Sequence, residues 1–193
     1  IDAMGDIDSG TQGIYARGAG AGNVVTITSV GDIDSNLSNG IQAEAMSAGG
    51  TVSINSTGNI EAGDTARAIR AIAGGDVQVA SAGDLTATNG VWAGQGIYAE
   101  SIAGMVTVSS VGDINAGDSG IKVDAANGAT IQSQGDVIAS GGDGIFIYSN
   151  GGAGDSSISS VGNATAGNLG TAVRTFSGAG SNTATSQPLN RKR

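Results

Sequence analysis

The sequence contains no cysteine and no histidine among its 193 residues. Disulfide bonds are therefore excluded, and so are nucleophiles that depend on a Ser-His or Cys-His pair. Proline occurs once and aromatic residues make up 3% of the chain, whereas glycine contributes 35 residues. Glycine at roughly 18% is far above the average of about 7%, but regular columns of Val and Ile distinguish the chain from a disordered linker.

Basic residues are also scarce, and the body of the chain is strongly acidic. The formal net charge is −9, from 17 acidic and 8 basic residues, and three of the basic residues close the chain at 191–193. An acidic body repels nucleic acid and anionic lipid, so we expect neither as a partner. No apolar run approaches the roughly 18 residues of a transmembrane helix, and no signal peptide is evident.

A short motif recurs along the chain and organises the rest of it. It is clearest at residues 106–116, Val-Thr-Val-Ser-Ser-Val-Gly-Asp-Ile-Asn-Ala, and its Gly-Asp or Gly-Asn step returns about every 23 to 29 residues. Self-similarity at a period of about 20 to 50 residues is the signature of a solenoid. We therefore expect one solenoid domain over residues 1–180, followed by a polar and basic tail or linker at 181–193. The glycines of the repeated step are Gly5, Gly31, Gly58, Gly83, Gly112, Gly135 and Gly162.

Side chains alternate in character on both sides of each of these glycines. Ile or Val stands four residues before the glycine and Ser stands two residues before it, while apolar or small residues follow at two and four positions after it. A period of two on both sides of a corner predicts two short strands joined by a bend, with these side chains turned inward. The inward residues expected before the corner are Ile27, Ile54, Val79, Val108, Ile131 and Ile158, with Ser29, Ser56, Ser81, Ser110, Ser133 and Ser160.

A third strand follows in each repeat, with the form Gly-Ile-x-Ala or similar. In the third repeat its register is ambiguous, and we favour the register that turns Ile69 and Ala71 inward. Three short strands per repeat, each pairing with its equivalent one repeat away, predict an all-β parallel β-helix of about seven coils spaced by about 4.8 Å. Leucine-rich repeats share the period, but the few leucines here lack their spacing, and the calcium-binding nonapeptide repeat is missing.

These repeats resemble the passenger regions of bacterial autotransporters of the pertactin type. The resemblance covers roughly residues 5–180 and rests on the segment 106–116 and on Gly-Ile-Lys-Val at 120–123. It implies a right-handed three-stranded β-helix on the surface of a Gram-negative bacterium, serving as an adhesin, an antigen or a stalk. We expect a fragment of such a passenger, attached to the outer membrane only through a missing C-terminal barrel. Haemagglutinin-type exoproteins, secreted through a separate pore, resemble it too, so the secretion route stays open.

Two columns of polar side chains accompany the corners. Binding of Ca²⁺ between coils would relieve repulsion among stacked carboxylates, but Asn in the same column favours bonding of each side chain to local backbone. We therefore expect no metal and no cofactor. The Ser column has no base to activate it, which favours a ladder of hydroxyls bonding along the rod over a set of nucleophiles. The acidic column comprises Asp6, Asp32, Asn59, Asp84, Asp113, Asp136 and Asn163.

The residues best suited to contact a partner lie in one loop and on one expected sheet face. The longest repeat carries the only tryptophan, Trp92, which could stack on a sugar, anchor a partner or simply cover its own coil. Outward positions of the third strand hold most of the aromatic and basic residues. A solvated ladder of cation–π neighbours explains this face, and a contact surface is the alternative. The candidate contact residues are Trp92, Tyr98, Arg70, Lys122, Phe146, Tyr15 and Tyr148.

The sequence favours a non-catalytic surface passenger that binds through this sheet face and its loops. The expected partners are a host surface glycan or protein, or a second copy through self-association. The alternative is a carbohydrate-active β-helix enzyme of the pectate-lyase or polygalacturonase kind, which needs several acids converging on a cleft, with Lys or Arg nearby. No long loop is expected to build such a cleft. An ice-binding solenoid would need a flat outward threonine array, which Thr26, Thr28 and Thr107 are not expected to form.

Overall fold

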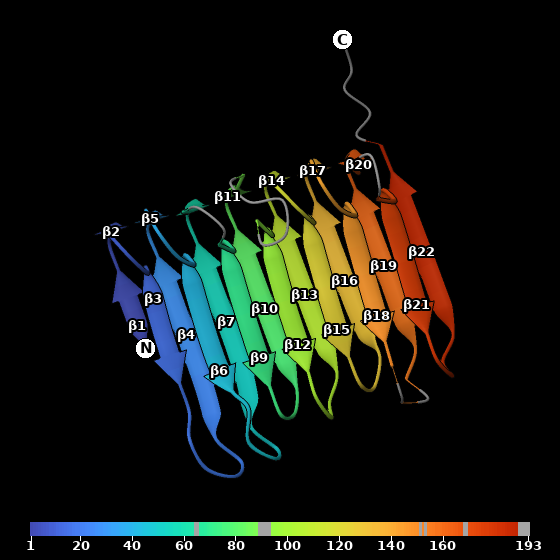
Figure 1. Ribbon diagram of the computed structural model, residues 1–193, viewed down its shortest axis with the longest axis horizontal. Coiled ribbons are helices and arrows are strands. Elements are labelled where there is room, and N and C mark those ends of the chain that lie inside the picture. The colour runs from blue at the N-terminus through green and yellow to red at the C-terminus, as the bar shows by residue number, and fades with distance from the viewer. Residues whose placement is uncertain (64–65, 89–93, 151, 153, 168–169, 189–193) are drawn as a thin grey trace.

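Each repeat of the sequence forms one coil of three short strands, as the alternation of side chains predicts (Figure 1). The computed structural model describes residues 1–63, 66–88, 94–150, 152, 154–167 and 170–188, and every regular element within these ranges is a β-strand. Equivalent strands of successive coils pair in parallel. The chain therefore winds into a right-handed parallel β-helix of three sheets and about six turns, with seven strands in each of two sheets.

The three sheets divide the strands by their position in the coil. Sheet A contains β1 (Asp2–Met4), β4 (Val24–Val30), β7 (Thr51–Thr57), β10 (Val77–Ala82), β13 (Val106–Val111), β16 (Ala129–Gln134), β19 (Ser156–Val161) and β22 (Asn182–Gln187). Sheet B contains β2 (Ile7–Ser9), β5 (Ile33–Ser35), β8 (Ile60–Ala62), β11 (Leu85–Ala87), β14 (Ile114–Ala116), β17 (Val137–Ala139) and β20 (Ala164–Thr165). Sheet C contains β3 (Ile14–Arg17), β6 (Ile41–Ala45), β9 (Ile69–Ala73), β12 (Ile97–Ser101), β15 (Ile121–Ala125), β18 (Ile145–Ser149) and β21 (Val173–Ser177).

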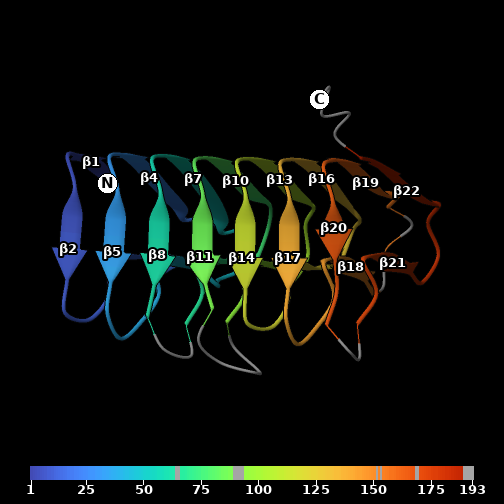
Figure 2. The same cartoon turned by 90° about the horizontal axis from the view of Figure 1, so that it is seen from above.

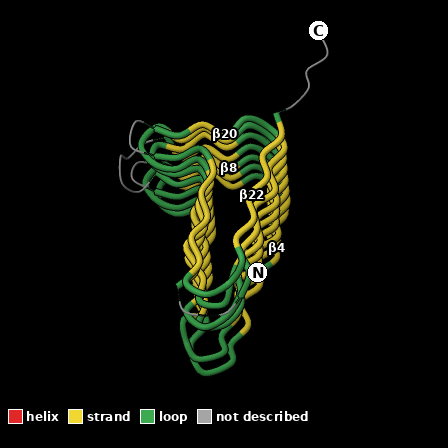
Figure 3. The backbone as a smooth tube through the Cα atoms, turned by 90° about the vertical axis from the view of Figure 1, so that its right-hand side faces the viewer, coloured by secondary structure: helices red, strands yellow, loops and turns green. Residues whose placement is uncertain are grey.

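Sheets A and C face each other across the core, and sheet B closes one end of the cross-section (Figure 3). The short strands of sheet B lie side by side along the rod (Figure 2). The described parts of the loops that lead from sheet B to sheet C project beyond the outer face of sheet C (Figure 3). This projection makes the outer face of sheet C the concave side of the rod near those loops.

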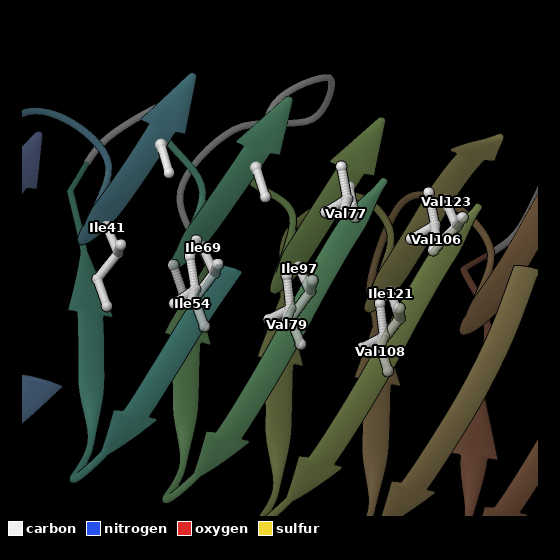
Figure 4. Close-up of a cluster of buried hydrophobic side chains, with 14 of the residues drawn as sticks. Ile41, Ile54, Ile69, Val77, Val79, Ile97, Val106, Val108, Ile121 and Val123 are labelled. Carbon is white, nitrogen blue, oxygen red and sulfur yellow. The ribbon is translucent and has the colours of Figure 1, made fainter. Parts of the chain in front are cut away.

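The side chains expected to point inward form one continuous core (Figure 4). The Ile and Val residues four positions before the corner glycines are at most 2% exposed. In the third repeat, Ile69 and Ala71 are fully buried, which confirms the favoured register. Stacking each apolar side chain on its equivalent one coil away removes apolar area from water, at about 25 cal/mol per Å², and this is the main stabilising contribution.

The corner glycines are required both by backbone conformation and by space. Their φ angles run from +98° at Gly5 to +138° at Gly162, in a region that residues with a Cβ rarely adopt. A Cβ atom on Gly58 would lie 2.3 Å from the carbonyl oxygen of Gly31 in the preceding coil. The repeated glycine therefore lets each coil approach the previous one closely enough for the strands on both sides to pair.

The structure differs from the expected tail at residues 181–193. Six of these residues form β22, which pairs in register with β19 and extends sheet A. The inward column continues into β22 with Ala184 opposite Ile158 and Ser186 opposite Ser160. Polar composition and Pro188 pointed to a tail, but Ser186 stands where the Ser column of the repeat would continue.

Replacing Val108 by Asp tests the core. Val108 is fully buried between Val79 of β10 and Ile131 of β16, so a carboxylate there would have no partner. We expect loss of the cooperative unfolding transition, because an unpaired buried charge costs several kcal/mol. The matched control is Val111→Asp on the same strand, since Val111 points outward and is 48% exposed. Equal melting curves for the two variants, followed by circular dichroism, would contradict the inward stack.

Candidate functional site

The outer face of sheet C gathers the chemically distinctive side chains of the molecule. Strand register places two outward columns along the rod. Every aromatic and every basic residue that the structure describes lies in these columns or in the loop that precedes β9. The first column is Tyr15, Gln42, Arg70, Tyr98, Lys122, Phe146 and Arg174, and the second is Arg17, Glu44, Ile72, Glu100, Asp124, Tyr148 and Phe176.

This face contains six of the seven candidate contact residues. Tyr15, Tyr98, Arg70, Lys122, Phe146 and Tyr148 all point outward from sheet C, and Trp92 lies outside the described residues. Their exposure differs in a way that the sequence does not reveal. Tyr15 is 47% and Tyr148 is 36% exposed, whereas the other four are half-buried among neighbouring side chains.

At the N-terminal end of this face, the carboxylate of Glu44 is held by several donors. Arg70 donates a charge-assisted hydrogen bond to Glu44 Oε1, and the Gln42 amide donates a second at 2.7 Å. Arg17 Nε lies 3.9 Å from Glu44 Oε2. Burial pushes the pKa of Glu44 upward, but the hydrogen bonds from Arg70 and Gln42 outweigh it, so that the pKa lies below its ordinary value of 4.5.

A groove occupies the next five coils, where sheet C meets the projecting loops. Its volume is about 400 Å³. On its sheet side, the ring of Tyr98 has Arg67 Cζ 4.8 Å and Lys122 Nζ 5.6 Å from its centroid. The ring of Phe146 has Arg174 Cζ at 4.3 Å. The lining residues are Arg67, Gln95, Tyr98, Asp118, Ser119, Lys122, Gly142, Asp143, Phe146, Gly170 and Arg174.

Hydrogen bonds fix the loop side of this groove. Arg67 Nε donates to Gln95 Oε1 at 2.6 Å, and Gln95 Nε2 donates to Asp118 Oδ2 at 3.1 Å. Asp143 accepts from the guanidinium of Arg174 at 2.7 Å and from the backbone N–H of Thr171 at 2.7 Å. Tyr98 donates its hydroxyl to Glu100 at 2.8 Å, and burial together with this bond raises its pKa. The groove is thus a preorganised polar surface.

The loop side of the groove was not predicted from the sequence. Apart from Asp118, its polar side chains belong to a column that stands two positions before the first Ile or Val of each third strand, where every copy is polar. Coil-to-coil backbone bonds align neighbouring members, such as Ala68 N–H with the Gln95 carbonyl. That regularity was visible in the sequence. The column comprises Gln12, Asn39, Arg67, Gln95, Ser119, Asp143 and Thr171.

Two aromatic rings stack beside the groove, on the same two strands as its last residues, Phe146 and Arg174. The ring centroids of Tyr148 and Phe176 lie 5.2 Å apart with an interplanar angle of 12°, and Phe176 is 50% exposed. Together with Phe146, Arg174 and Thr175 they line a shallow hollow of about 240 Å³. These rings offer more accessible apolar surface than Tyr98 or Phe146, whose faces cations already cover.

The acidic corner column bonds to backbone, but between coils rather than within one corner. Asp6 Oδ1 accepts from the backbone N–H of Asp32 at 3.0 Å, and Asp32 Oδ1 accepts from Asn59 N–H at 2.7 Å. The same bond repeats up to Asn163. The prediction that each side chain bonds to the backbone of its own corner was therefore wrong. The corner points each side chain along the rod, so that it reaches the backbone N–H of the next coil. Among the described residues, no group of three or more acids is arranged to hold a metal ion.

The Ser column does not form the expected hydroxyl ladder. Ser56, Ser81, Ser110, Ser133 and Ser160 are buried, and within the described chain their Oγ atoms have no hydrogen-bond partner. Equivalent atoms one coil apart are separated by about 4.8 Å, whereas an O–H···O bond needs about 2.5 to 3.0 Å. Small size, rather than hydroxyl bonding, is what suits Ser to this narrow part of the core.

The outer face of sheet A contrasts with that of sheet C. From β4 to β22 its outward residues carry no charge, and register aligns Thr26, Ser53, Gln78, Thr107, Thr130, Ser157 and Thr183 in one column. Several outward threonines of sheet A thus align in one column, although the sequence was not expected to form such an array. Gln78 and the serines interrupt the column, so it is not a uniform threonine array.

No family model matches this chain, and neither a curated protein nor a solved structure is significantly similar to it. No helix among the described residues has the length and apolar character needed to span a membrane. The class that the fold defines is the right-handed parallel β-helix. Within that class, the distinguishing feature of this molecule is the aromatic and cationic outer face of sheet C.

The intercoil bond of the corner column predicts a difference between two substitutions of Asp113. Asp113→Asn should leave stability unchanged or slightly raised, because Asn59 accepts the same bond from Asp84 N–H and the amide removes one like charge. Asp113→Ala should lower the free energy of unfolding by about 1 kcal/mol, because the N–H of Asp136 loses that acceptor. Urea denaturation measures both variants. An alanine variant as stable as the asparagine variant would count against the bond.

The environment of Glu44 predicts a pH-dependent contribution to stability. Because its pKa is depressed in the folded state, Glu44 stabilises the fold above pH 4.5, and this contribution is lost as pH falls through the folded pKa. Glu44→Gln should therefore be less stable than the native chain at pH 7, with the difference vanishing under acid conditions. Glu61→Gln, on the exposed face of sheet B, is the control. A Glu44→Gln deficit that persists unchanged below pH 3 would contradict this origin.

Proposed function

We propose that this chain is a non-catalytic binding rod, the passenger part of an autotransporter-like surface protein, acting as an adhesin or an adhesive stalk. The observation that carries the proposal is the segregation of every described aromatic and basic residue to the outer face of sheet C and its adjoining loop. Aromatic rings and arginines are the residues that dominate contact energies at protein interfaces. A solenoid core needs none of them on its outer surface, so the segregation supports a contact role.

The proposed surroundings are the outside of a bacterial cell, with the passenger attached to the outer membrane in its parent protein. The absence of cysteine is compatible with this location, because each coil is held by its neighbours rather than by disulfides. Three strands per coil and a repeat of this length also agree with passengers of the pertactin type. The partner is a host glycan, a host protein or a second copy of the rod.

An enzymatic role is the alternative, and the groove is where it would reside. The groove brings Asp118 and Asp143 together with Arg67, Lys122 and Arg174, although no long loop was expected to build a cleft. A general acid or base must be free to exchange a proton with the substrate. Asp143 already accepts from Arg174 and Thr171, and Asp118 accepts from Gln95. These bonds favour binding over catalysis.

Adhesion should depend on the stacked rings of Tyr148 and Phe176 more than on the rings of Tyr98 and Phe146. Tyr148→Ser with Phe176→Ser removes the two accessible rings, and we expect binding to fall by about tenfold or more, since interface aromatics commonly contribute 2 kcal/mol or more. The assay measures binding of the rod to a panel of glycans, host surface proteins and the rod itself, with thermal melts run in parallel. Tyr98 and Phe146 are poorer choices because cations and hydrogen bonds engage them.

The control is Val30→Ser with Val111→Ser on sheet A, which removes two exposed apolar side chains from the face without aromatics. It should bind like the native rod. A folded Tyr148/Phe176 variant that binds as well as the control would refute the contact role of the stacked rings, and a native rod that binds no member of the panel would refute the contact role of sheet C. Release of reducing ends from a polysaccharide would favour the enzymatic alternative.

A further inference from the structure

The groove on sheet C has the shape of a site for an elongated ligand. Its lining comes from five successive coils, from Arg67 before β9 to Arg174 on β21. At a spacing of about 4.8 Å per coil, the lining extends about 19 Å along the rod. A volume of about 400 Å³ spread over that length is long and shallow. Such a shape suits a linear chain lying parallel to the rod rather than a compact small molecule.

The charges of the groove favour an anionic group on that chain. The groove has three cations and two carboxylates in a molecule whose net charge is −9. Arg174 is paired with Asp143, and Lys122 lies 3.8 Å from Asp124. Arg67 is half-buried, and among the described residues no carboxylate lies within ion-pair distance of its guanidinium. A half-buried cation with no carboxylate in direct contact is costly, and an incoming carboxylate would offset that cost.

Arg67 is also held in place before any ligand arrives. Its Nε donates to Gln95, and its guanidinium lies over the ring of Tyr98, so little side-chain freedom remains to be lost on binding. Lys122 approaches the same ring. Burial and the nearby Arg70 lower the pKa of Arg67, and the more distant carboxylates of Asp118 and Glu100 offset this only in part. Arg67 and Lys122 thus flank one ring from coils that are about 9.6 Å apart along the rod, so that each can meet a different carboxylate of a linear chain.

The remaining polar groups favour a saccharide over a polyphosphate chain. Asp118, Asp143, Gln95 and Ser119 offer acceptors and donors that suit sugar hydroxyls. Two carboxylates inside the groove would repel the closely spaced charges of a polyphosphate. Arg67 and Lys122 already lie over the ring of Tyr98 and Arg174 lies over the ring of Phe146, so a base would have to compete with these cations for stacking.

We propose that this groove binds a linear saccharide that carries carboxylates, with Arg67 and Lys122 each holding a carboxylate and the loop side holding sugar hydroxyls. The inference rests on the proposed function, because it names the class of ligand that the sheet C face takes. It adds a binding site beside the stacked rings of Tyr148 and Phe176, and the two share Phe146 and Arg174 in their linings. Uronate chains from a host matrix and from a bacterial or algal polysaccharide share this chemistry.

The test is a titration of the whole chain, by calorimetry, with hyaluronan and polymannuronate oligosaccharides of matched length. Each is compared with its carboxyl-reduced form, and single-stranded DNA and inorganic polyphosphate are the competing anions. We expect the uronates to bind about tenfold more tightly than their reduced forms, because a charge-assisted hydrogen bond is lost on reduction. The two oligosaccharides distinguish the host source from the microbial one. Equal affinity for native and reduced oligosaccharides, or tighter binding of DNA or polyphosphate, would overturn the proposal.

Substitutions locate the site. Arg67→Gln and Lys122→Gln should each weaken uronate binding by about tenfold. Arg17→Gln should not, because Arg17 lies on the same sheet outside the groove with a side chain that is 64% exposed. If Arg67→Gln fails to fold, the Lys122→Gln variant and the comparison of native with carboxyl-reduced oligosaccharides still test the proposed site. Unchanged uronate affinity in a folded Lys122→Gln variant would overturn the assignment, while adhesion that still depends on Tyr148 and Phe176 would leave the proposed function standing.

Discussion

Stacking of each coil on the previous one, in register, is the constraint on which the rest of the structure depends. The corner glycines make it possible, because a Cβ on Gly58 would collide with the Gly31 carbonyl. The corner side chains reinforce it, since each Asp or Asn accepts the backbone N–H of its equivalent in the next coil. Because the corner is fixed in this way, the strands on both sides of it pair in a single register, and each side chain stacks on the equivalent side chain of the next coil.

Register of this kind frees the outer faces to differ from one another. Inward columns must stay apolar or small to keep the core filled, whereas an outward column can change in every coil without disturbing the stack. Sheet A uses this freedom to present an uncharged face from β4 to β22, while sheet C presents cations, rings and carboxylates. Because neighbouring coils lie about 4.8 Å apart, outward side chains within one column touch, and the contact of Tyr98 with Lys122 follows.

Much of this could be predicted from the repeat. The inward column from Ile27 to Ile158 and the register of Ile69 in the ambiguous third repeat are confirmed, because a period of two leaves one consistent way to fill the core. The prediction of a hydroxyl ladder was wrong, because the alternation of residues gives the direction of a side chain but not the distance between its hydroxyl and the equivalent hydroxyl one coil away. β22 was missed because Ala184 and Pro188 replace the Ile and Gly of the motif.

The sequence by itself determined the number of strands per coil, the corner positions and the face on which each strand residue lies, since all three follow from local periodicity. Only the tertiary structure decided which of those residues remain accessible and which are already engaged. Tyr98 and Tyr148 both point outward from sheet C, yet cations cover one and a stacked ring partners the other. The groove itself arises because loop residues such as Arg67 and Gln95 fold back beside the sheet, and the path of a loop depends on packing that periodicity does not encode.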